Sequence, residues 1–233
     1  MARVFCFPDL HFPFANNKKL NRAFAALQSM RLGKGDVVIQ LGDLYDQYSE
    51  TKYFRSLNLY TPKEESEIAY AQGRLFWQNV MKCVSRSTRL IQLRGNHDVR
   101  RYKRMMEKCP ELESMTNFKG PYIFPRVETV FDPREETVID GVVYTHGWLG
   151  GCRGKLSHAR YLNMPVVHGH DHQAYVDIMN FKRGKLFEMS CGLLADYDSL
   201  PLSYRSTKTT QWVHAFATVE VVGGIPYPHV FAV

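Results

Sequence analysis

The chain has 233 residues, 45% hydrophobic and 23% charged, which is enough for one well-filled core and typical of a single α/β domain. The net charge of +7 and the pI of about 9.1 permit an anionic substrate without identifying one. We find no secretory signal, no apolar stretch of membrane-spanning length and no CxxC pair among five scattered cysteines, so we expect a cytoplasmic protein without membrane partners.

The first half of the chain alternates predicted strands and helices. An apolar run at 4–7, a helix over 18–30 with one apolar face and a strand at 37–41 form an expected βαβ unit with a parallel strand pair. A helix over 61–84 begins with a Thr-Pro-Lys-Glu sequence typical of a capping box. A buried strand at 90–93 follows it.

The second half favours strands. After a helix expected over 99–109, residues 110–135 are rich in Pro and Gly and irregular. Asp140-Gly141 separates two short apolar runs and suits a type I′ turn, so it predicts a hairpin. We expect one more strand at 186–191 and a terminal hairpin over 213–233.

We therefore expect one domain over 1–233, with 47–84 as a helical insertion and 186–233 as C-terminal strands. The insertion could cover a binding pocket or form a dimer contact, or it could be an ordinary crossover helix with a long approach loop. Both interpretations stay open, and so does the choice between a monomer and a homodimer.

Five apolar runs end in residue types that bind metals. These ends carry Asp9 and His11; Asp43 and Asp46; Asn96, His97 and Asp98; His146; and His168, His170 and His172. Ligands bind at the carboxyl ends of strands in open α/β sheets, so five such coincidences indicate one shared site. Asp, His and Asn suit Mn, Fe, Zn, Ni, Co or Mg ions, and the lack of Cys argues against a soft-metal or structural zinc site.

The motifs Asp9-x-His11, Gly42-Asp43-x-x-Asp46, Gly95-Asn96-His97-Asp98, His146 and Gly169-His170-x-His172 resemble, in type and order, those of the calcineurin-like metallophosphoesterase superfamily. The layout, including Gln211-Trp212, is similar to small phage and prophage members, which would act in a host cytoplasm. The fold that this resemblance implies is α/β, a four-layer α/β/β/α sandwich with two mixed β-sheets in a single domain.

The resemblance also implies a role for each motif residue. Asp9, His11 and His172 would hold one divalent ion, Asn96, His146 and His170 a second, and Asp43 would bridge the two, with Mn favoured. His97 would contact the phosphate or protonate the leaving group, with Asp98 orienting it. Asp46 and His168 would support the ligands from behind; the rival pair His168/His170 is disfavoured by the Gly-His-x-His pattern.

Departures from the pattern narrow the function. Gln47 follows Asp46, where protein phosphatases of the superfamily have a phosphate-clamping Arg, and residues 173–233 are too few for the extra domain of large repair nucleases. The favoured function is a two-metal phosphodiesterase acting on nucleotides or nucleic acid. A phosphomonoesterase of a small metabolite or nucleotide is the alternative. A non-enzymatic scaffold ranks last, because all seven ligand types are kept.

Cationic residues directly follow the Gly-Asn-His-Asp motif. Arg100, Arg101 and Arg104 predict a basic helix beside the site that could track the phosphates of a nucleic-acid strand. The alternative is a solvated helix face whose charges pair with nearby acidic residues such as Glu107 and Glu111.

Overall fold

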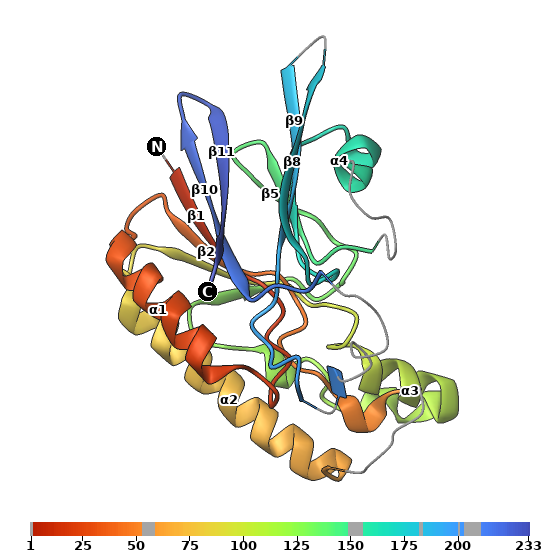
Figure 1. Ribbon diagram of the computed structural model, residues 1–233. Coiled ribbons are helices and arrows are strands. Elements are labelled where there is room, and N and C mark those ends of the chain that lie inside the picture. The colour runs from red at the N-terminus through yellow and green to blue at the C-terminus, as the bar shows by residue number, and fades with distance from the viewer. Residues whose placement is uncertain (1, 53–58, 149–155, 182–183, 200, 203–210) are drawn as a thin grey trace.

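The computed structural model describes residues 2–52, 59–148, 156–181, 184–199, 201–202 and 211–233. Two β-sheets stand face to face, and helices lie on their outer sides (Figure 1). This is the expected α/β architecture with two mixed sheets in a single domain. None of the described helices combines the length and apolar character needed to cross a membrane.

One sheet has six strands in the order β11-β10-β1-β2-β3-β4. They are β1 (Ala2–Phe7), β2 (Val37–Gln40), β3 (Arg89–Gln92), β4 (Val127–Thr129), β10 (Ala215–Val222) and β11 (Ile225–Ala232). Strands β1 to β4 are parallel, and the terminal β10–β11 hairpin joins this sheet antiparallel to β1. The parallel strands end at the same edge, where Asp9, Asp43 and Asn96 follow them.

The other sheet has five strands in the order β5-β6-β7-β9-β8. They are β5 (Thr137–Ile139), β6 (Val142–Thr145), β7 (Val166–His168), β8 (Ala174–Phe181) and β9 (Gly184–Cys191). Strands β6, β7 and β9 are parallel, with antiparallel strands at both edges. The β5–β6 turn has φ of 48° at Asp140 and 78° at Gly141, so the predicted type I′ hairpin is confirmed.

Two long helices, α1 (Asn17–Met30) and α2 (Pro62–Cys83), cover the outer face of the six-stranded sheet (Figure 1). Together with the sheet they enclose a core that includes Phe5, Phe7, Leu27, Phe76 and Trp77. The α2 helix joins the parallel strands β2 and β3, so it has the position of an ordinary crossover helix.

A second core fills the space between the two sheets. It includes Val4, Cys6 and Ile39 of one sheet and Tyr144, Val167 and Met189 of the other. Side chains alternate along each strand, so β1 points Val4 and Cys6 inward and its phenylalanines toward the helices. The short helix α4 (Ser157–Leu162) packs on the outer face of the five-stranded sheet, which completes the four layers.

Local sequence explains where the long helices begin. Asn16 Oδ1 accepts a hydrogen bond from the Lys19 amide, 3.2 Å away, and caps the start of α1. At α2, the Glu64 amide donates to Thr61 Oγ1 at 3.2 Å and the Thr61 amide donates to the Glu64 carboxylate at 2.8 Å. The capping box predicted from the sequence is therefore confirmed.

Among the described residues, two strands and one α-helix were not predicted. The β4 strand has three residues and lies in the Pro- and Gly-rich stretch, beside 3₁₀ turns at Pro110–Met115 and Gly120–Tyr122. The α4 helix has six residues, too few to show a helical period. The β8 strand is a sheet edge whose sequence AYVDIMNF does not alternate between apolar and polar residues.

Gly73 gives a test of the packing between α2 and the sheet edge. A Cβ added there would lie 2.8 Å from Cε1 of the fully buried Tyr45, whose hydroxyl is held by the Pro121 carbonyl at 2.9 Å. We expect Gly73→Ala to destabilise the protein by about 1–3 kcal/mol, although Ala normally favours a helix. Chemical denaturation measures this, with exposed Gln78→Ala as the control; a stabilised Gly73→Ala protein would contradict the packing described.

Candidate metal centre

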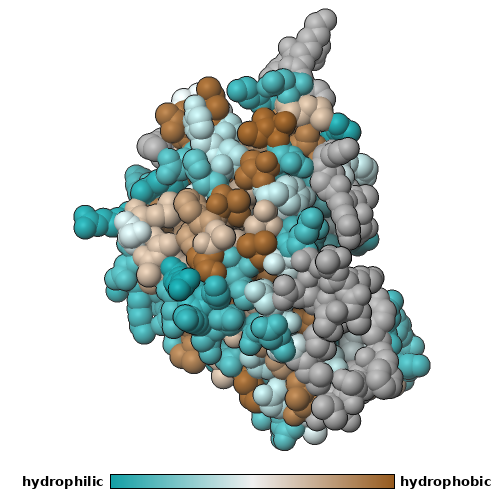
Figure 2. Space-filling view, in the orientation of Figure 1, coloured by the Kyte–Doolittle hydropathy of each residue, from teal (hydrophilic) through white to brown (hydrophobic). Residues whose placement is uncertain are grey.

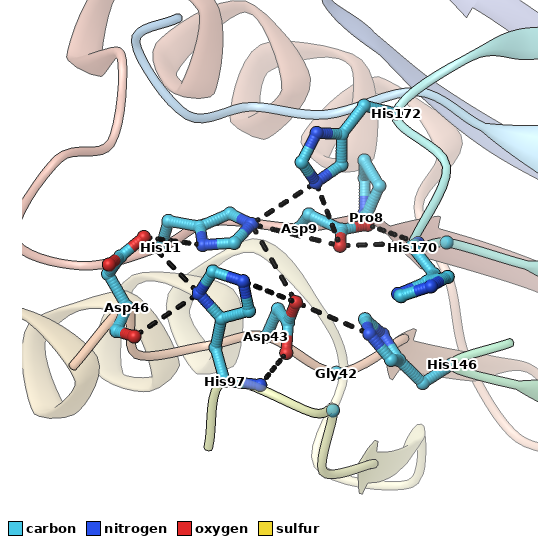
Figure 3. Close-up of polar contacts among 12 residues, drawn as sticks. Pro8, Asp9, His11, Gly42, Asp43, Asp46, His97, His146, His170 and His172 are labelled. Carbon is cyan, nitrogen blue, oxygen red and sulfur yellow. Dashed lines mark hydrogen bonds and ion pairs between the residues drawn. The ribbon is translucent and has the colours of Figure 1, made fainter. Parts of the chain in front are cut away.

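The side chains of the five motifs meet where strand ends of the two sheets converge (Figure 3). The loops after β1, β2 and β3 contribute Asp9, His11, Asp43 and Asn96, and those after β6 and β7 contribute His146, His170 and His172.

One cluster consists of Asp9, His11 and His172, all buried. His172 Nε2 lies 3.5 Å from Asp9 Oδ1 and 3.3 Å from His11 Nε2. His11 Nε2 lies 3.9 Å from the same Asp9 oxygen. Three potential ligand atoms thus surround one position.

The second cluster consists of Asp43, His146 and His170. His146 Nε2 lies 3.3 Å from Asp43 Oδ2 and 2.9 Å from Asn96 Oδ1. The rings of His146 and His170 are 5.1 Å apart, and the His170 amide donates to the Asp9 carboxylate at 3.1 Å. The backbone of His170 therefore supports the first cluster while its imidazole belongs to the second.

Asp43 lies between the two clusters. Its Oδ2 is 3.8 Å from His11 Nε2 and 3.3 Å from His146 Nε2, and its Oδ1 accepts the His97 amide at 2.8 Å. An oxygen that faces both clusters has the position of a carboxylate shared by two ions.

The backbone at the centre is strained. His11, Asp43, His170 and His172 have φ of 50°, 51°, 71° and 60°, in the left-handed region. Such conformations cost about 1–3 kcal/mol each in non-glycine residues and cluster at functional sites. The surrounding contacts must therefore hold these loops in place.

Two motif glycines let the chain pass directly against the carboxylates. A Cβ on Gly95 would lie 2.5 Å from the Asp43 nitrogen and 2.7 Å from its Cγ. A Cβ on Gly169 would collide with Oδ2 of Asp9. Neither position has room for any other residue.

The hydrogen bonds show that the centre fits cations. His146 Nδ1 donates to the Leu41 carbonyl at 3.0 Å, because a carbonyl only accepts. The Nε2 lone pair of the neutral ring then faces the Asp43 carboxylate. His11 donates through Nδ1 to Asp46 at 2.9 Å and faces His172 with its own Nε2. The Nε2 lone pairs of His11 and His146 thus face carboxylate oxygens of Asp9 and Asp43, an arrangement that a cation stabilises, and these nitrogen and oxygen donors suit Mn, Fe or Zn.

In the metal-free protein a proton on His146 lies between its imidazole and the Asp43 carboxylate. Burial raises the pKa of Asp43, but the His146 and His97 imidazoles lower that pKa by more, to well below its ordinary value. Burial lowers the pKa of His146, but the facing Asp43 carboxylate outweighs it and raises the pKa to about 9. A metal ion must displace this proton.

Asp46 and Asp98 support the centre in different ways. Asp46 Oδ2 is 2.9 Å from His11 Nδ1 and 3.4 Å from His97 Nδ1, so it orients both rings. The buried carboxylate of Asp98, whose pKa burial raises to about 6, points instead at backbone amides. It accepts from Leu44 at 3.2 Å, Tyr45 at 2.9 Å and Gly95 at 2.8 Å. Asp46 thus has the orienting position that we expected for Asp98, and Asp98 ties two motif loops together.

His97 lies beside both clusters and contacts Arg100. Arg100 Nη2 is 2.7 Å from His97 Nε2, and its Nη1 donates to the Asp46 carbonyl at 3.1 Å. A guanidinium only donates, so His97 accepts at Nε2 and carries its proton on Nδ1, which faces the Asp46 carbonyl at 3.2 Å. Arg100 is therefore the arginine of α3 (Arg100–Lys108) that reaches the centre.

The other two arginines of the expected basic face lie farther out. Arg101 Nη1 is 3.3 Å from Ser66 Oγ, and Arg104 Nη1 is 3.2 Å from Glu50 Oε2. Arg104 and Glu50 line a groove of about 550 Å³ that also includes Tyr60. The acidic partner of Arg104 comes from the loop after β2 and not from the end of its own helix.

His168 turns away from the centre. Its Nε2 lies 3.5 Å from Glu188 Oε1, and the same oxygen lies 3.3 Å from His158 Nδ1. Sequence reasoning missed Glu188 and left His158 outside every motif. A signal for Glu188 existed, because it is an acidic residue between Phe187 and Met189 in an otherwise apolar run.

A comparison with the profiles of known protein families shows which family the chain belongs to. The profile of the calcineurin-like phosphoesterase family matches residues 2–176, which include all five motifs. The chain belongs to the calcineurin-like phosphoesterase family. A comparison with curated proteins finds no match. A Thermotoga maritima protein solved by NMR aligns over 100% of both chains at 14% identity, with a TM-score of 0.40.

Family membership and the His/Asp clusters together identify a metal-dependent phosphoesterase that uses divalent ions. The narrower likeness to small phage and prophage calcineurin-like phosphoesterases stays a prediction.

The proton on His146 makes metal binding pH-dependent. Proton and metal compete for the same Nε2 lone pair, so below pH 9 we expect apparent metal affinity to fall by about tenfold per pH unit for this proton. Calorimetric titration between pH 6 and 9 measures the slope, with the exposed His229→Gln variant as a control of unchanged slope. An affinity independent of pH would contradict the assignment of His146 as a ligand.

Proposed function

We propose that this calcineurin-like phosphoesterase is a phosphodiesterase that uses two metal ions and acts on nucleotides or nucleic acid. The observation that carries the proposal is the position of Asp43 Oδ2, which faces His11 at 3.8 Å and His146 at 3.3 Å. Mn²⁺ is the favoured ion, because it suits mixed carboxylate, amide and imidazole donors; Fe, Zn, Ni, Co and Mg are the alternatives.

In this proposal some residues bind the ions and others orient the binding side chains. When bound, the two ions supply Lewis-acid activation of the phosphoester and of the attacking water. Asp9, His11 and His172 hold one ion, Asn96, His146 and His170 hold the other, and Asp43 is shared. Asp46 and the Leu41 carbonyl engage the Nδ1 protons of His11 and His146, which leaves each Nε2 available as a ligand.

His97 is the candidate proton donor to the leaving oxygen. Burial lowers its pKa, so the resting imidazole is neutral, with Nε2 engaged by Arg100. We infer that the substrate phosphate attracts the Arg100 guanidinium away from His97. Nε2 then takes up a proton from solvent water, and Asp46, 3.4 Å from Nδ1, stabilises the doubly protonated ring, which gives the Nε2 proton to the leaving oxygen.

The surroundings favour an extended diester over a small monoester. The groove of about 550 Å³ begins at Ser49 and Glu50, a few residues beyond Asp46, and is lined by Arg104. Arg101 is exposed on the same helix. A substrate with several phosphates could contact both arginines while one phosphate occupies the centre. The phosphomonoesterase remains the alternative, and the complete ligand set disfavours a non-enzymatic scaffold.

The described cysteines support the cytoplasmic location that forms part of this proposal. Cys6, Cys83, Cys109 and Cys191 are free. Free thiols are typical of a reducing compartment, which supports the cytoplasmic location included in this proposal.

The shared carboxylate gives the decisive experiment. Asp43→Asn removes the charge that faces both ions, and we expect loss of hydrolysis of bis-p-nitrophenyl phosphate by more than about 100-fold. Activity is measured against p-nitrophenyl phosphate in parallel with Mn²⁺, Ni²⁺, Mg²⁺ and Zn²⁺. Asp140→Asn, at the far end of β6, is the matched control. Wild-type turnover by Asp43→Asn or by metal-stripped protein would exclude the two-ion site.

Loss of a proton donor slows hydrolysis most for substrates whose leaving group must be protonated. His97→Ala should slow alkyl phosphodiesters by about 10²–10⁴-fold and aryl esters much less, because aryl oxides leave without protonation. Metal content, measured by elemental analysis, should not change. If His97→Ala loses an ion, His97 is a ligand and the role given to it is wrong.

Substitution of Arg101 and Arg104 tests whether the substrate is a nucleic acid, because it leaves the contact between Arg100 and His97 intact. Arg101→Ala/Arg104→Ala should weaken DNA or RNA binding and lower the salt slope by about one unit for each phosphate that the variant no longer neutralises. Hydrolysis of bis-p-nitrophenyl phosphate should be unaffected. Arg22→Ala/Lys34→Ala, with the same loss of charge at exposed positions, is the control. No polymer cleavage by the wild type with any of the metals would favour a small-molecule substrate instead.

A further inference from the structure

The imidazole of His172 differs from those of His11 and His146 in what holds its Nδ1 atom. His11 Nδ1 faces the Asp46 carboxylate at 2.9 Å, and His146 Nδ1 faces the Leu41 carbonyl at 3.0 Å. His172 Nδ1 is buried and has no hydrogen-bond partner among the described residues. A neutral ring that binds a metal through Nε2 carries its proton on Nδ1, and metal-bound histidines almost always donate that proton to an acceptor. One candidate ligand of the first cluster therefore lacks the usual hydrogen bond.

An aromatic side chain, that of Trp212, lies against the His172 ring. The two ring centroids are 4.5 Å apart and the ring planes form an angle of 76°. In a perpendicular pair this close, the edge of one ring points at the face of the other. His172 Nε2 points toward Asp9 and His11, at 3.5 Å and 3.3 Å (Figure 3). The indole therefore contacts a part of the imidazole other than Nε2.

The chain around Trp212 holds the indole in place. Trp212 forms an antiparallel bridge with Gln173, and the amide of the next residue, Val213, donates to the His172 carbonyl at 3.1 Å. The Trp212 side chain packs against three buried apolar residues, Leu193, Ala195 and Leu202. The indole is thus a fixed surface beside a residue whose own backbone is strained, with φ of 60°.

The face of an indole can take the place of a hydrogen-bond acceptor, because it carries the negative part of the ring quadrupole. An N–H group directed at such a face makes a weak contact in a neutral ring. A metal-bound imidazole is more positive, and the face of Trp attracts positive groups more strongly than the faces of Tyr and Phe do. The contact between the two rings is therefore expected to strengthen when His172 holds an ion, which packing alone would not explain.

We propose that Trp212 is a positioning residue of the metal centre: its indole face accepts the Nδ1 proton of His172 and keeps Nε2 directed at the first cluster. The inference rests on the proposed role of His172 as a ligand. It gives a role to the Gln211-Trp212 sequence, which lies outside the five motifs.

Two substitutions separate the aromatic face from simple packing, since Trp212→Phe keeps an aromatic ring and Trp212→Leu keeps only apolar volume. In a calorimetric titration with Mn²⁺, we expect Trp212→Leu to weaken the binding of one of the two ions by about tenfold, and Trp212→Phe to weaken it much less. Trp148→Leu is the matched control, because Trp148 makes a similar perpendicular contact at 5.0 Å with His158, outside the two clusters. Unchanged affinities in Trp212→Leu, or equal losses in both variants at position 212, would overturn the proposal.

The Nδ1 proton can also be observed by NMR spectroscopy. A proton over the face of an aromatic ring is shielded, so in the zinc-loaded protein we expect the Nδ1–H resonance of His172 upfield of those of His11 and His146. Trp212→Leu should move this resonance downfield and leave the other two in place. An unchanged His172 resonance in Trp212→Leu would overturn the contact between the proton and the indole.

A third variant distinguishes this inference from the ligand assignment on which it rests. His172→Ala removes the imidazole, and elemental analysis should find one ion fewer per chain than in the wild type. If His172→Ala keeps both ions, the ligand set of the proposed function is wrong, and the role of Trp212 is wrong with it. If His172→Ala loses one ion while Trp212→Leu binds both ions as tightly as the wild type, only the role of Trp212 is wrong.

Discussion

Four carboxylates, those of Asp9, Asp43, Asp46 and Asp98, are each at most 2% exposed in one small region. An ionised carboxylate buried without a partner costs several kcal/mol, so each must be compensated. Backbone amides compensate Asp98, and the His11 and His97 imidazoles compensate Asp46. In the metal-free protein Asp43 is compensated by the His97 amide and the protonated His146 imidazole, and Asp9 by the His170 amide; a metal ion takes the place of the proton. The arrangement of the centre follows from this requirement.

Parallel strands make such a concentration of charge possible. Because β1, β2 and β3 end at one edge, their loops deliver Asp9, Asp43 and Asn96 side by side, and β6 and β7 do the same from the facing sheet. Within the loops, glycines without room for a Cβ and ligands with positive φ bring backbone and carboxylate into direct contact. Local strain is thus accepted where it creates the cation site.

Much of this could be predicted from the sequence, for physical reasons. Each ligand-type residue of the two clusters lies within four residues of a strand end, so the geometry of the strand ends brings it to the centre. Strong local signals such as the Thr61–Glu64 capping box and the Asp140-Gly141 turn fix their own elements. The role of Asp98 could not be predicted, because its partners Leu44 and Tyr45 are backbone amides more than fifty residues away. The same holds for Glu188, whose partners come from a helix too short to show a period and from an edge strand.

Each of the two His/Asp clusters of the candidate centre takes residues from both sheets: Asp9 and His11 with His172, and Asp43 with His146 and His170. A bound ion is therefore a further cross-link between two layers that are also joined by apolar packing and by hydrogen bonds such as those from His146 to Leu41 and from His170 to Asp9. By thermodynamic linkage, whatever changes the distance between the layers changes metal affinity, and metal occupancy stiffens the sandwich in return. Metal supply then acts on the mechanical properties of the whole molecule as well as on its chemistry.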